Sequence, residues 1–411
     1  MMKNFNFAFR LTLCLFAFPL SDALGQDSTS VQAAETAVGT SKKWYEKINI
    51  RGYTQVRYNR LLETNPNLQC EQCDRSWGEN GGISFRRIRI IFFGQLHERL
   101  SFYIQPDFAS SASATGLHFA QLRDAYFDLS LGRKGAYRLR FGQSKMPYGF
   151  ENMQSSQNRL PLDRNDALNS ALSNERDLAL VLYWAPAPIR ERFSQLVNTG
   201  LKGSGDYGVF GLGVFNGQSA NRPDANNSLH IVARLSYPFP LQNGQLIEPG
   251  LQAYTGKVVV SSVGINVMGI NDAFEYRDSR VAGTFVLYPK PFGIQAEYNY
   301  GTGPQYNPQT NRIEQRTLKG GYVTASYLIK KNDSFLIPFT RYQYYEGGKK
   351  FEMDARSYRV NEWELGVEWQ PFRNFELVTM YTLSDRTFED SALPWNRQKG
   401  SLLRLQAQFN L

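Results

Sequence analysis

The chain has few of the residues on which catalytic and metal-binding sites usually depend. Its 411 residues include 3 cysteines and 3 histidines, which leaves little room for a metal cage or for a Ser/His/Asp arrangement. Beyond residue 25, no apolar run approaches the ~20 residues that a membrane-spanning helix needs. We therefore expect no catalytic residue, no bound metal and no cofactor, and we exclude a helical membrane protein.

The chain also lacks the composition of a disordered protein and the charge distribution of a nucleic-acid-binding one. Aromatic residues make up 14% of it, far more than a chain without packed structure carries. The net charge of +9 favours anionic partners, but the basic residues are spread along the chain and form no basic tail. We therefore expect small anionic or hydrophilic solutes as partners and no nucleic acid.

The first segment, residues 1–25, has the pattern of a secretory signal peptide. Lys3 and Arg10 provide a positive start, and an apolar stretch of about ten residues follows, too short to span a membrane as a helix. Small residues near position 25 suit cleavage there. We expect an exported chain in which residues 26–43 form a flexible leader and residues 44–411 form the folded domain.

Alternation of apolar and polar residues dominates the folded domain. About sixteen segments of roughly ten residues show this period of two, and turn residues separate them. In residues 362–369, Trp, Leu and Val alternate with Glu and Gly, and residues 400–411 follow the same rule. Such segments are either strands of a soluble sheet, which buries its apolar face, or strands of a barrel, which turns that face to lipid.

The lengths of the connections decide between these two interpretations. Short and long connections alternate, as they do in outer-membrane barrels with short periplasmic turns and long external loops. The short ones lie at 97–100, 132–135, 237–244, 289–293, 330–333 and 371–374, and the long ones at 59–83, 146–177, 217–227, 258–278, 302–317, 346–356 and 386–397. One exception, 186–205, is long where a short turn is expected, so it holds either an extra strand pair or a periplasmic extension.

The pattern predicts an all-β protein, a transmembrane antiparallel β-barrel of about 16 strands. Lipid cannot satisfy an open sheet edge, so the strands must close into a ring, and a ring of this size leaves a lumen for water. Aromatic residues near strand ends, such as Trp363, Trp369 and Phe372, fit the girdles at the membrane interfaces. We expect the outer membrane of a Gram-negative bacterium as the location, with lipid and lipopolysaccharide as neighbours.

Several segments of the chain resemble a known family, the phosphate-selective porins O and P. They are FRRIRIIFFGQLHERLSFYIQPDFA at 85–109, LRDAYFDL at 122–129, LRFGQSKMPYGFE at 139–151, NERDLAL at 174–180 and GVFNG at 213–217. The resemblance implies a trimeric porin of about 16 strands whose third external loop, here 146–177, folds inward and narrows the lumen. It implies passive diffusion of small hydrophilic solutes, with anions such as phosphate favoured.

Basic side chains on the lumen face are the candidate selectivity residues, because cations in a narrow channel attract anions. By their phase on the strands, or by their place at the third loop, these are Arg51, Arg57, Arg87, Arg89, Arg138, Arg140, Lys145, Arg159, Arg164 and Arg176. Arg86 has the opposite phase, so we expect it to face lipid headgroups. Guanidinium groups suit phosphate and carboxylate because they form paired hydrogen bonds with them.

Acidic residues leave the selectivity open. Asp124 and Glu364 share the lumen phase, and Glu151 and Glu175 lie in the third loop, so all four are placed to pair with the arginines. The wall is then either anion-preferring or mixed and weakly selective, and no cluster of lysines marks a phosphate-binding constriction. The alternative function is a barrel that binds partners through its long external loops.

Cys70 and Cys73 form a C-x-x-C pair in the first long loop. No second ligand pair or thioredoxin-like unit accompanies them, which argues against zinc or redox chemistry. An exported compartment favours disulfides, so we expect these two cysteines to be bonded to each other.

Overall fold

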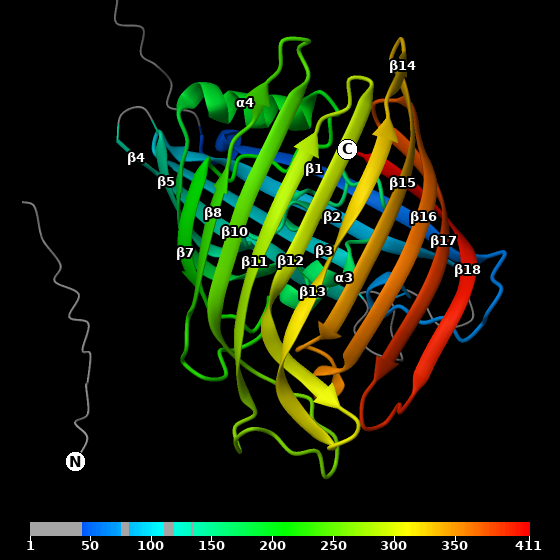
Figure 1. Ribbon diagram of the computed structural model, residues 1–411. Coiled ribbons are helices and arrows are strands. Elements are labelled where there is room, and N and C mark those ends of the chain that lie inside the picture. The colour runs from blue at the N-terminus through cyan, green and yellow to red at the C-terminus, as the bar shows by residue number, and fades with distance from the viewer. Residues whose placement is uncertain (1–42, 75–81, 111–118, 133–134) are drawn as a thin grey trace, which may run out of the picture. The chain divides into compact units, whose positions relative to one another are not determined.

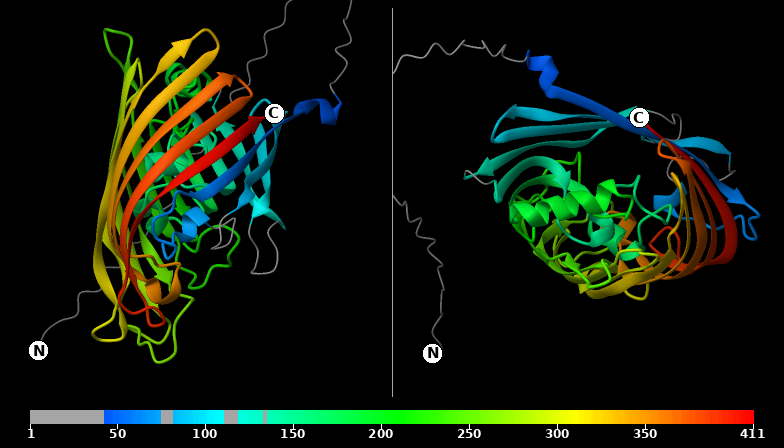
Figure 2. Two further views of the ribbon diagram at one scale, coloured as in Figure 1. Left: turned by 90° about the vertical axis from the view of Figure 1, so that its right-hand side faces the viewer. Right: turned by 90° about the horizontal axis from the view of Figure 1, so that it is seen from above.

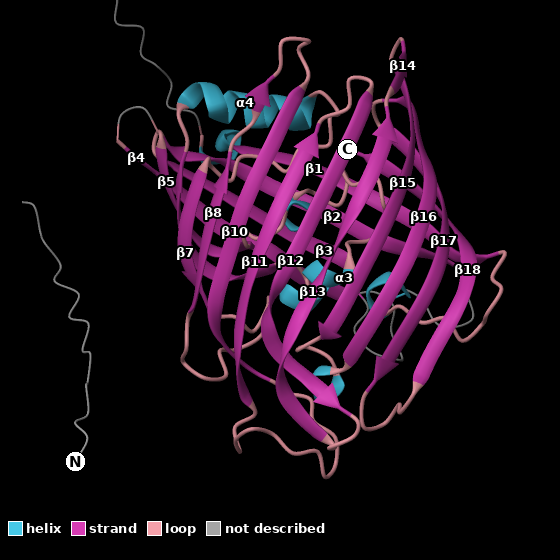
Figure 3. Ribbon diagram, in the orientation of Figure 1, coloured by secondary structure: helices cyan, strands magenta, loops and turns pink. Residues whose placement is uncertain are grey.

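The computed structural model describes residues 43–74, 82–110, 119–132 and 135–411, and the described chain is almost entirely β-sheet (Figure 1 and Figure 3). The predicted signal peptide, residues 1–25, lies outside the described residues. So does the predicted leader, residues 26–43, apart from its last residue.

Eighteen strand segments make up the sheet of the described residues. They are β1 (Ile48–Leu61), β2 (Ile83–His97), β3 (Leu100–Ser110), β4 (Phe119–Leu131), β5 (Tyr137–Lys145), β6 (Arg176–Trp184), β7 (Phe210–Phe215), β8 (His230–Ser236), β9 (Phe239–Pro240), β10 (Leu246–Val259), β11 (Glu275–Leu287), β12 (Phe292–Asn307), β13 (Arg312–Tyr327), β14 (Ile329–Lys331), β15 (Ser334–Gly348), β16 (Ser357–Phe372), β17 (Phe375–Glu389) and β18 (Asn396–Asn410). The helices are α1 (Glu71–Asp74), α2 (Phe150–Met153), α3 (Asp166–Ala171) and α4 (Ala187–Asn198), with 3-10 turns η1 (Trp44–Lys47) and η2 (Met353–Ala355). None of these described helices is long and apolar enough to cross a membrane.

The strands form one antiparallel sheet that closes on itself. The short segments β9 and β14 continue β8 and β13, so the ring has 16 strands. The first strand pairs with the last: Tyr53 of β1 lies opposite Asn410 of β18, and Tyr58 lies opposite Leu405. Closure leaves the sheet no open edge, as lipid requires. The predicted fold class, an all-β barrel of about 16 strands, is therefore confirmed.

The barrel is apolar outside and polar inside. On β16, Trp363 and Leu365 are each 50% exposed, whereas Glu364 between them is 1% exposed. The same alternation runs along β11, where Phe285 is exposed and Arg280 is buried. A soluble sheet shows the opposite arrangement, with its apolar residues in the core, so the outer face is the one that contacts lipid.

The two ends of the barrel differ in the length of their connections. Turns such as 332–333 and 373–374 join strands at the end drawn uppermost in Figure 1, whereas long connections such as 260–274 lie at the opposite end. The expectation of a long loop at 302–317 is wrong. β12 and β13 pair as far as Asn307 and Arg312, so the hairpin continues past the length that a membrane crossing needs.

The exceptional connection at 186–205 contains α4 and no extra strand pair. Of the two interpretations given for it, the extension at the short-turn end is therefore the one that the structure shows. A proline in the first turn suits the start of the helix, because that position needs no N–H donor. Ile189, Phe193 and Leu196 recur at helical spacing, and all three are buried. Seen from above, α4 lies across the opening of the barrel (Figure 2).

Candidate functional site

The connection between β5 and β6, residues 146–175, runs inside the barrel, and we call it the lumen loop. The hydroxyl of Tyr148 donates to Asn299 Oδ1 on β12 at 2.7 Å. Further along, Ser156 Oγ lies 2.6 Å from the hydroxyl of Tyr53 on β1. Because β12 and β1 stand far apart around the ring, a loop that contacts both crosses the interior.

Local interactions give the lumen loop a defined shape. Gly149 has a φ of 76°, and a Cβ at this position would collide with Leu168, so the turn requires glycine. The Asn165 side chain caps α3 by accepting from the backbone N–H of Leu168 at 3.1 Å. Glu151 Oε2 in turn accepts from the Asn165 side chain at 2.8 Å. These contacts fix the backbone of the lumen loop and therefore the positions of its charged side chains.

Asp163 of the lumen loop is surrounded by three arginines from the wall. Its carboxylate lies 3.0 Å from Arg57 Nη1 on β1 and 3.3 Å from Arg86 Nη2 on β2, and it also forms an ion pair with Arg404 on β18. Burial alone would raise the pKa of Asp163, but these arginines outweigh it and hold the pKa well below its usual value. One carboxylate thus fastens the loop to the wall and leaves an excess of positive charge.

Glu175, at the other end of the lumen loop, is a second centre of the same kind. Its carboxylate lies 3.0 Å from Arg159 Nη2, 3.2 Å from Arg164 Nε and 3.5 Å from Lys145 Nζ, and it also pairs with Arg176. Four cationic side chains therefore meet at one carboxylate.

A β-bulge on β2 turns Arg86 into the lumen, so the expectation that Arg86 faces lipid is wrong. Gln55 of β1 pairs with Arg87, but the next residue, Val56, pairs with Phe85, which leaves Arg86 as the extra residue. Two successive arginines then lie on the inner side. A strict period of two cannot predict a bulge. The two adjacent arginines in FRRIR were the sequence signal for it, because one of them would otherwise face lipid.

A second β-bulge lies on β4 and turns another arginine inward. Gln105 of β3 pairs with Asp124, and the next residue, Pro106, pairs with Leu122, so Arg123 is the extra residue. The Arg123 guanidinium donates to a backbone carbonyl of the lumen loop at 3.3 Å and forms an ion pair with no described carboxylate. Sequence reasoning missed this cation as well, because its strand phase points outward.

Arg87 is a buried cation that lacks a carboxylate partner among the described residues. It is 7% exposed, and its Nη1 donates to Gln55 Oε1 at 2.7 Å. The charged groups that act on it most strongly are the cations of Arg86, Arg89 and Arg159. Arg87 is therefore held in a strongly positive environment.

Together these side chains form what we call the basic cluster. Its ten cations are Arg57, Arg86, Arg87, Arg89, Arg123, Lys145, Arg159, Arg164, Arg176 and Arg404, and its four carboxylates are Asp107, Asp124, Asp163 and Glu175. It carries six more positive than negative charges. On the opposite half of the ring the charges are closer to balance. Arg341, for example, pairs with both Glu151 and Glu364.

The remaining predicted residues lie outside the basic cluster, toward the short-turn end. Arg140 donates two hydrogen bonds of 2.8 Å to Asp128, and Arg138 Nη1 lies 3.1 Å from Asp206 Oδ2. These two arginines are therefore neutralised by carboxylates. Arg51 is exposed and forms an ion pair with no described carboxylate. Of the ten predicted residues, the structure brings seven together and leaves these three apart.

Cys70 and Cys73 are joined by a disulfide in the connection after β1, with an S–S distance of 2.10 Å. Asn59 Nδ2 of β1 donates to the carbonyl oxygen of Cys73 at 3.1 Å, which ties the bridged turn to the wall. The described residues contain no group of side chains suited to hold a metal ion.

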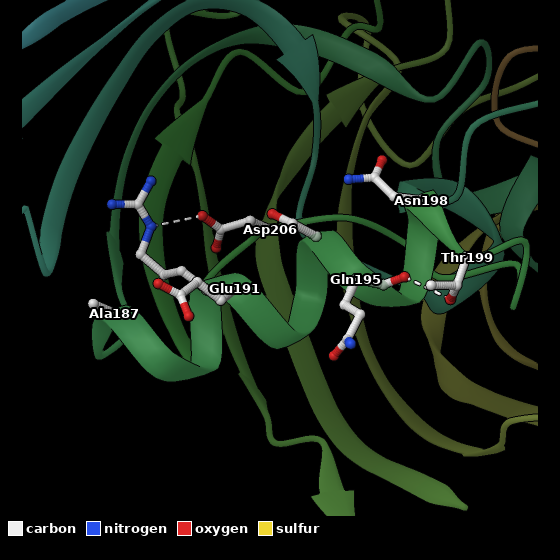
Figure 4. A pocket seen from close by; sticks show the side chains of 8 residues that line it. Ala187, Glu191, Gln195, Asn198, Thr199 and Asp206 are labelled. Atoms are coloured by element: carbon white, nitrogen blue, oxygen red, sulfur yellow. Dashed lines mark hydrogen bonds and ion pairs between the residues drawn. The ribbon is translucent and has the colours of Figure 1, made fainter.

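A hollow of about 550 Å³ runs along the exposed side of α4 (Figure 4). Its lining residues are Ala187, Arg190, Glu191, Ser194, Gln195, Asn198, Thr199 and Asp206. Arg190 Nε lies 2.9 Å from Asp206 Oδ2, so the one basic side chain of the lining is already neutralised. This hollow has no excess of positive charge, unlike the basic cluster.

A family model for phosphate-selective porins O and P matches residues 69–411. The chain belongs to this family. The porin is therefore a channel of the Gram-negative outer membrane, through which solutes pass by diffusion. The predicted family and location are confirmed. A comparison with curated proteins finds no match.

Solved structures of other outer-membrane proteins share the porin's fold. The channel DcaP of Acinetobacter baumannii is 13% identical, with a TM-score of 0.53, over 89% of this chain and 97% of its own. OmpF of Salmonella typhi, in complex with daunomycin, is 12% identical, with a TM-score of 0.55 and the same coverage. The anion-selective porin from Comamonas acidovorans is 9% identical, with a TM-score of 0.54, over 89% of this chain and 99% of its own. Identities this low speak for the fold alone.

Proposed function

We propose that the porin passes small hydrophilic solutes with a preference for anions, phosphate among them, and that the basic cluster selects them. The observation that carries this proposal is the excess of cations, ten against four carboxylates, on one half of the lumen. Fixed positive charge beside a narrow, low-dielectric wall concentrates anions and repels cations. Guanidinium groups add paired hydrogen bonds to phosphate or carboxylate oxygens.

The basic cluster combines cations of the lumen loop with cations of the barrel wall. Arg159 and Arg164 belong to the loop, whereas Arg87 and Arg89 belong to the wall strand β2. The loop is bonded to this part of the wall through Ser156 and Asp163, so the cations of both lie together at one side of the lumen. Their summed field acts on a solute that passes through the rest of the lumen. The predicted anion-preferring wall is favoured over the mixed wall because the carboxylates that balance the arginines lie mainly on the other half of the ring.

Replacing Arg87 with glutamine tests this role of the basic cluster. The change removes one positive charge without breaking an ion pair, since the only hydrogen-bond partner of Arg87 among the described residues is Gln55. A unit charge about 5 Å from a passing ion in water is worth ~0.8 kcal/mol, as attraction for an anion and as repulsion for a cation. Its loss therefore changes the anion-to-cation permeability ratio by ~1.7 kcal/mol, a fall of roughly 15-fold at low salt. The ratio is measured from the reversal potential in planar bilayers under a salt gradient.

Arg277→Gln is the matched control for Arg87→Gln. Arg277 is exposed on the outer phase of β11, and its Nε donates to Ser279 Oγ at 3.1 Å. Its loss removes the same charge outside the lumen and should leave the reversal potential unchanged. Equal reversal potentials for the two variants would remove Arg87 from the selective passage.

We also propose that the porin assembles as a homotrimer among lipid and lipopolysaccharide. OmpT of Vibrio cholerae, solved in a trimer form, supports this: it is 10% identical, with a TM-score of 0.51, over 89% of this chain and 99% of its own. Light scattering of the detergent-purified porin should give three times the chain mass. A single-chain mass at concentrations where the channel is active would contradict the trimer.

A further inference from the structure

The connection between β6 and β7 reaches across the barrel at the short-turn end. Lys202 follows α4, and its Nζ lies 2.5 Å from Glu368 Oε1 on β16 and 3.6 Å from Glu376 Oε2 on β17. In the ring, six strands separate β7 from β16, and six strands separate β17 from β6. The ion pair therefore joins opposite sides of the barrel.

Residues 199–205, with the sequence TGLKGSG, form the segment that carries Lys202, and we call it the strap. Lys202 itself has a φ of 65°, a left-handed conformation that is rare outside glycine. Gly200 and Gly205 flank it with φ values of 77° and 104°, and little else lies near them. One side of the strap rests on α4, since Leu201 packs against the apolar cluster of Leu196 and the backbone N–H of Gly203 donates to the Leu196 carbonyl oxygen at 3.2 Å. The ion pairs of Lys202 hold its other side against β16 and β17.

Two further contacts tie the strap and α4 to the lumen loop. Gln154 Nε2 donates to the carbonyl oxygen of Lys202 at 2.6 Å. Leu196 of α4 packs with Phe150 of the lumen loop, and Val286 at the end of β11 belongs to the same apolar cluster. The helix, the strap and the lumen loop thus form a continuous structure from the middle of the barrel to its short-turn end, where Figure 2 shows α4 over the opening.

We propose that α4 and the strap form a second constriction at the periplasmic mouth, held closed by the ion pairs of Lys202 with Glu368 and Glu376. Short turns face the periplasm in barrels of this kind. The proposal rests on the channel activity of the family and not on the sign of the porin's selectivity.

The charge at this second constriction lacks the positive excess of the basic cluster. Glu368 and Glu376 are 0% and 3% exposed, and Gln370 Nε2 donates to both, at 2.6 and 3.0 Å. One lysine faces two carboxylates that Gln370 bridges, so this group has no excess of positive charge. Lys202 therefore has two roles: it fastens the strap, and it limits the repulsion of anions at the mouth.

We call the ion pairs of Lys202 with Glu368 and Glu376 the latch. Two variants break it and change the local charge in opposite directions. Lys202→Gln removes the cation, and the double variant Glu368→Gln with Glu376→Gln removes the carboxylates. At 1 M salt, where the Debye length is about 3 Å, charge effects on the passing ions are largely screened. Both variants should then show a higher single-channel conductance than the unmodified porin, because the strap is released in each. At 0.1 M salt, a charge about 8 Å from the ion path shifts the permeability ratio about twofold, toward cations for Lys202→Gln and toward anions for the double variant.

Lys331→Gln is the matched control for these variants. Lys331 lies at the same end of the barrel, is exposed, and forms an ion pair with no described residue. This control should keep the conductance of the unmodified porin. Heat-dependent migration in SDS gels shows which variants are folded, and the double variant carries the test if Lys202→Gln does not fold.

Charge reversal separates a latch from a residue needed only for packing. Lys202→Glu combined with Glu368→Lys should return the 1 M conductance toward that of the unmodified porin, which loss of packing would not do. Unchanged 1 M conductance in both latch variants would overturn the proposal. Failure of the proposed anion preference would appear instead in the unmodified porin, as a reversal potential of zero or of cationic sign, and would leave the latch result intact.

Discussion

Replacing Asp163 with asparagine tests whether a few carboxylates hold the basic cluster together. Asparagine keeps the size of the side chain and removes its charge, so the guanidinium groups of Arg57, Arg86 and Arg404 lose their shared counter-ion. These three side chains are at most 14% exposed, so water screens little of their mutual repulsion. Removing one partner of a buried ion pair costs roughly 3–5 kcal/mol, and we expect a loss of this size in the free energy of unfolding.

The measurement is reversible urea unfolding of the porin in detergent, followed by tryptophan fluorescence and extrapolated to zero denaturant. Asp385→Asn is the matched control, because the Asp385 carboxylate lies 2.8 Å from Arg397 Nη2, with both side chains partly in solvent. Exposed ion pairs contribute little to stability, so this control should unfold like the unmodified porin. The reasoning is refuted if Asp163→Asn is no more destabilising than Asp385→Asn.

Three further predictions follow from the same charges and contacts. Arg138→Ala and Arg140→Ala should change the permeability ratio less than removal of a basic-cluster cation, since carboxylates already neutralise both; an equal change in bilayer reversal potential would contradict this. Burial alone would raise the pKa of Asp166, but neighbouring cations outweigh it and lower the pKa from 3.8 to about 2, so Asp166 stabilises the fold above about pH 4, and this contribution is lost as the pH falls toward 2. Urea unfolding at pH 5 and pH 3 should therefore differ less in Asp166→Asn than in the unmodified porin, and an identical difference would count against the assignment. Cys70→Ser with Cys73→Ser should leave conductance unchanged and cost little stability, because the bridge closes a very short loop; a large loss of folded protein in gels would show a wider role.

The strands and their inward faces could be predicted because lipid and water act on every residue in turn. Trp363 and Glu364 differ by one position and lie on opposite faces, so a period of two carries both the strand and its orientation. Arg87 and Arg89 follow the same rule and lie inside the barrel. The same logic fails at Arg86, where a bulge inserts one residue and reverses the phase for a single position.

Other features depend on contacts between distant parts of the chain, which periodicity does not report. The hairpin at 302–317 is held by pairing between its two arms. The helix within 186–205 is fixed by packing against the lumen loop and β11. The balance of charge is likewise a three-dimensional property: Arg140 and Arg87 look alike in sequence, but Asp128 neutralises the first, and no described carboxylate pairs with the second.

The reversal potential of the unmodified porin in a planar bilayer tests the central claim most directly. Low salt is required, because the Debye length of about 10 Å at 0.1 M lets the basic cluster act on ions in the passage. With potassium chloride more concentrated on one side, an excess of fixed positive charge predicts a reversal potential with the sign of chloride permeation, and this potential should shrink as the salt concentration rises. A potential of zero, or one with the sign of potassium permeation, would contradict the claim that the basic cluster governs what passes.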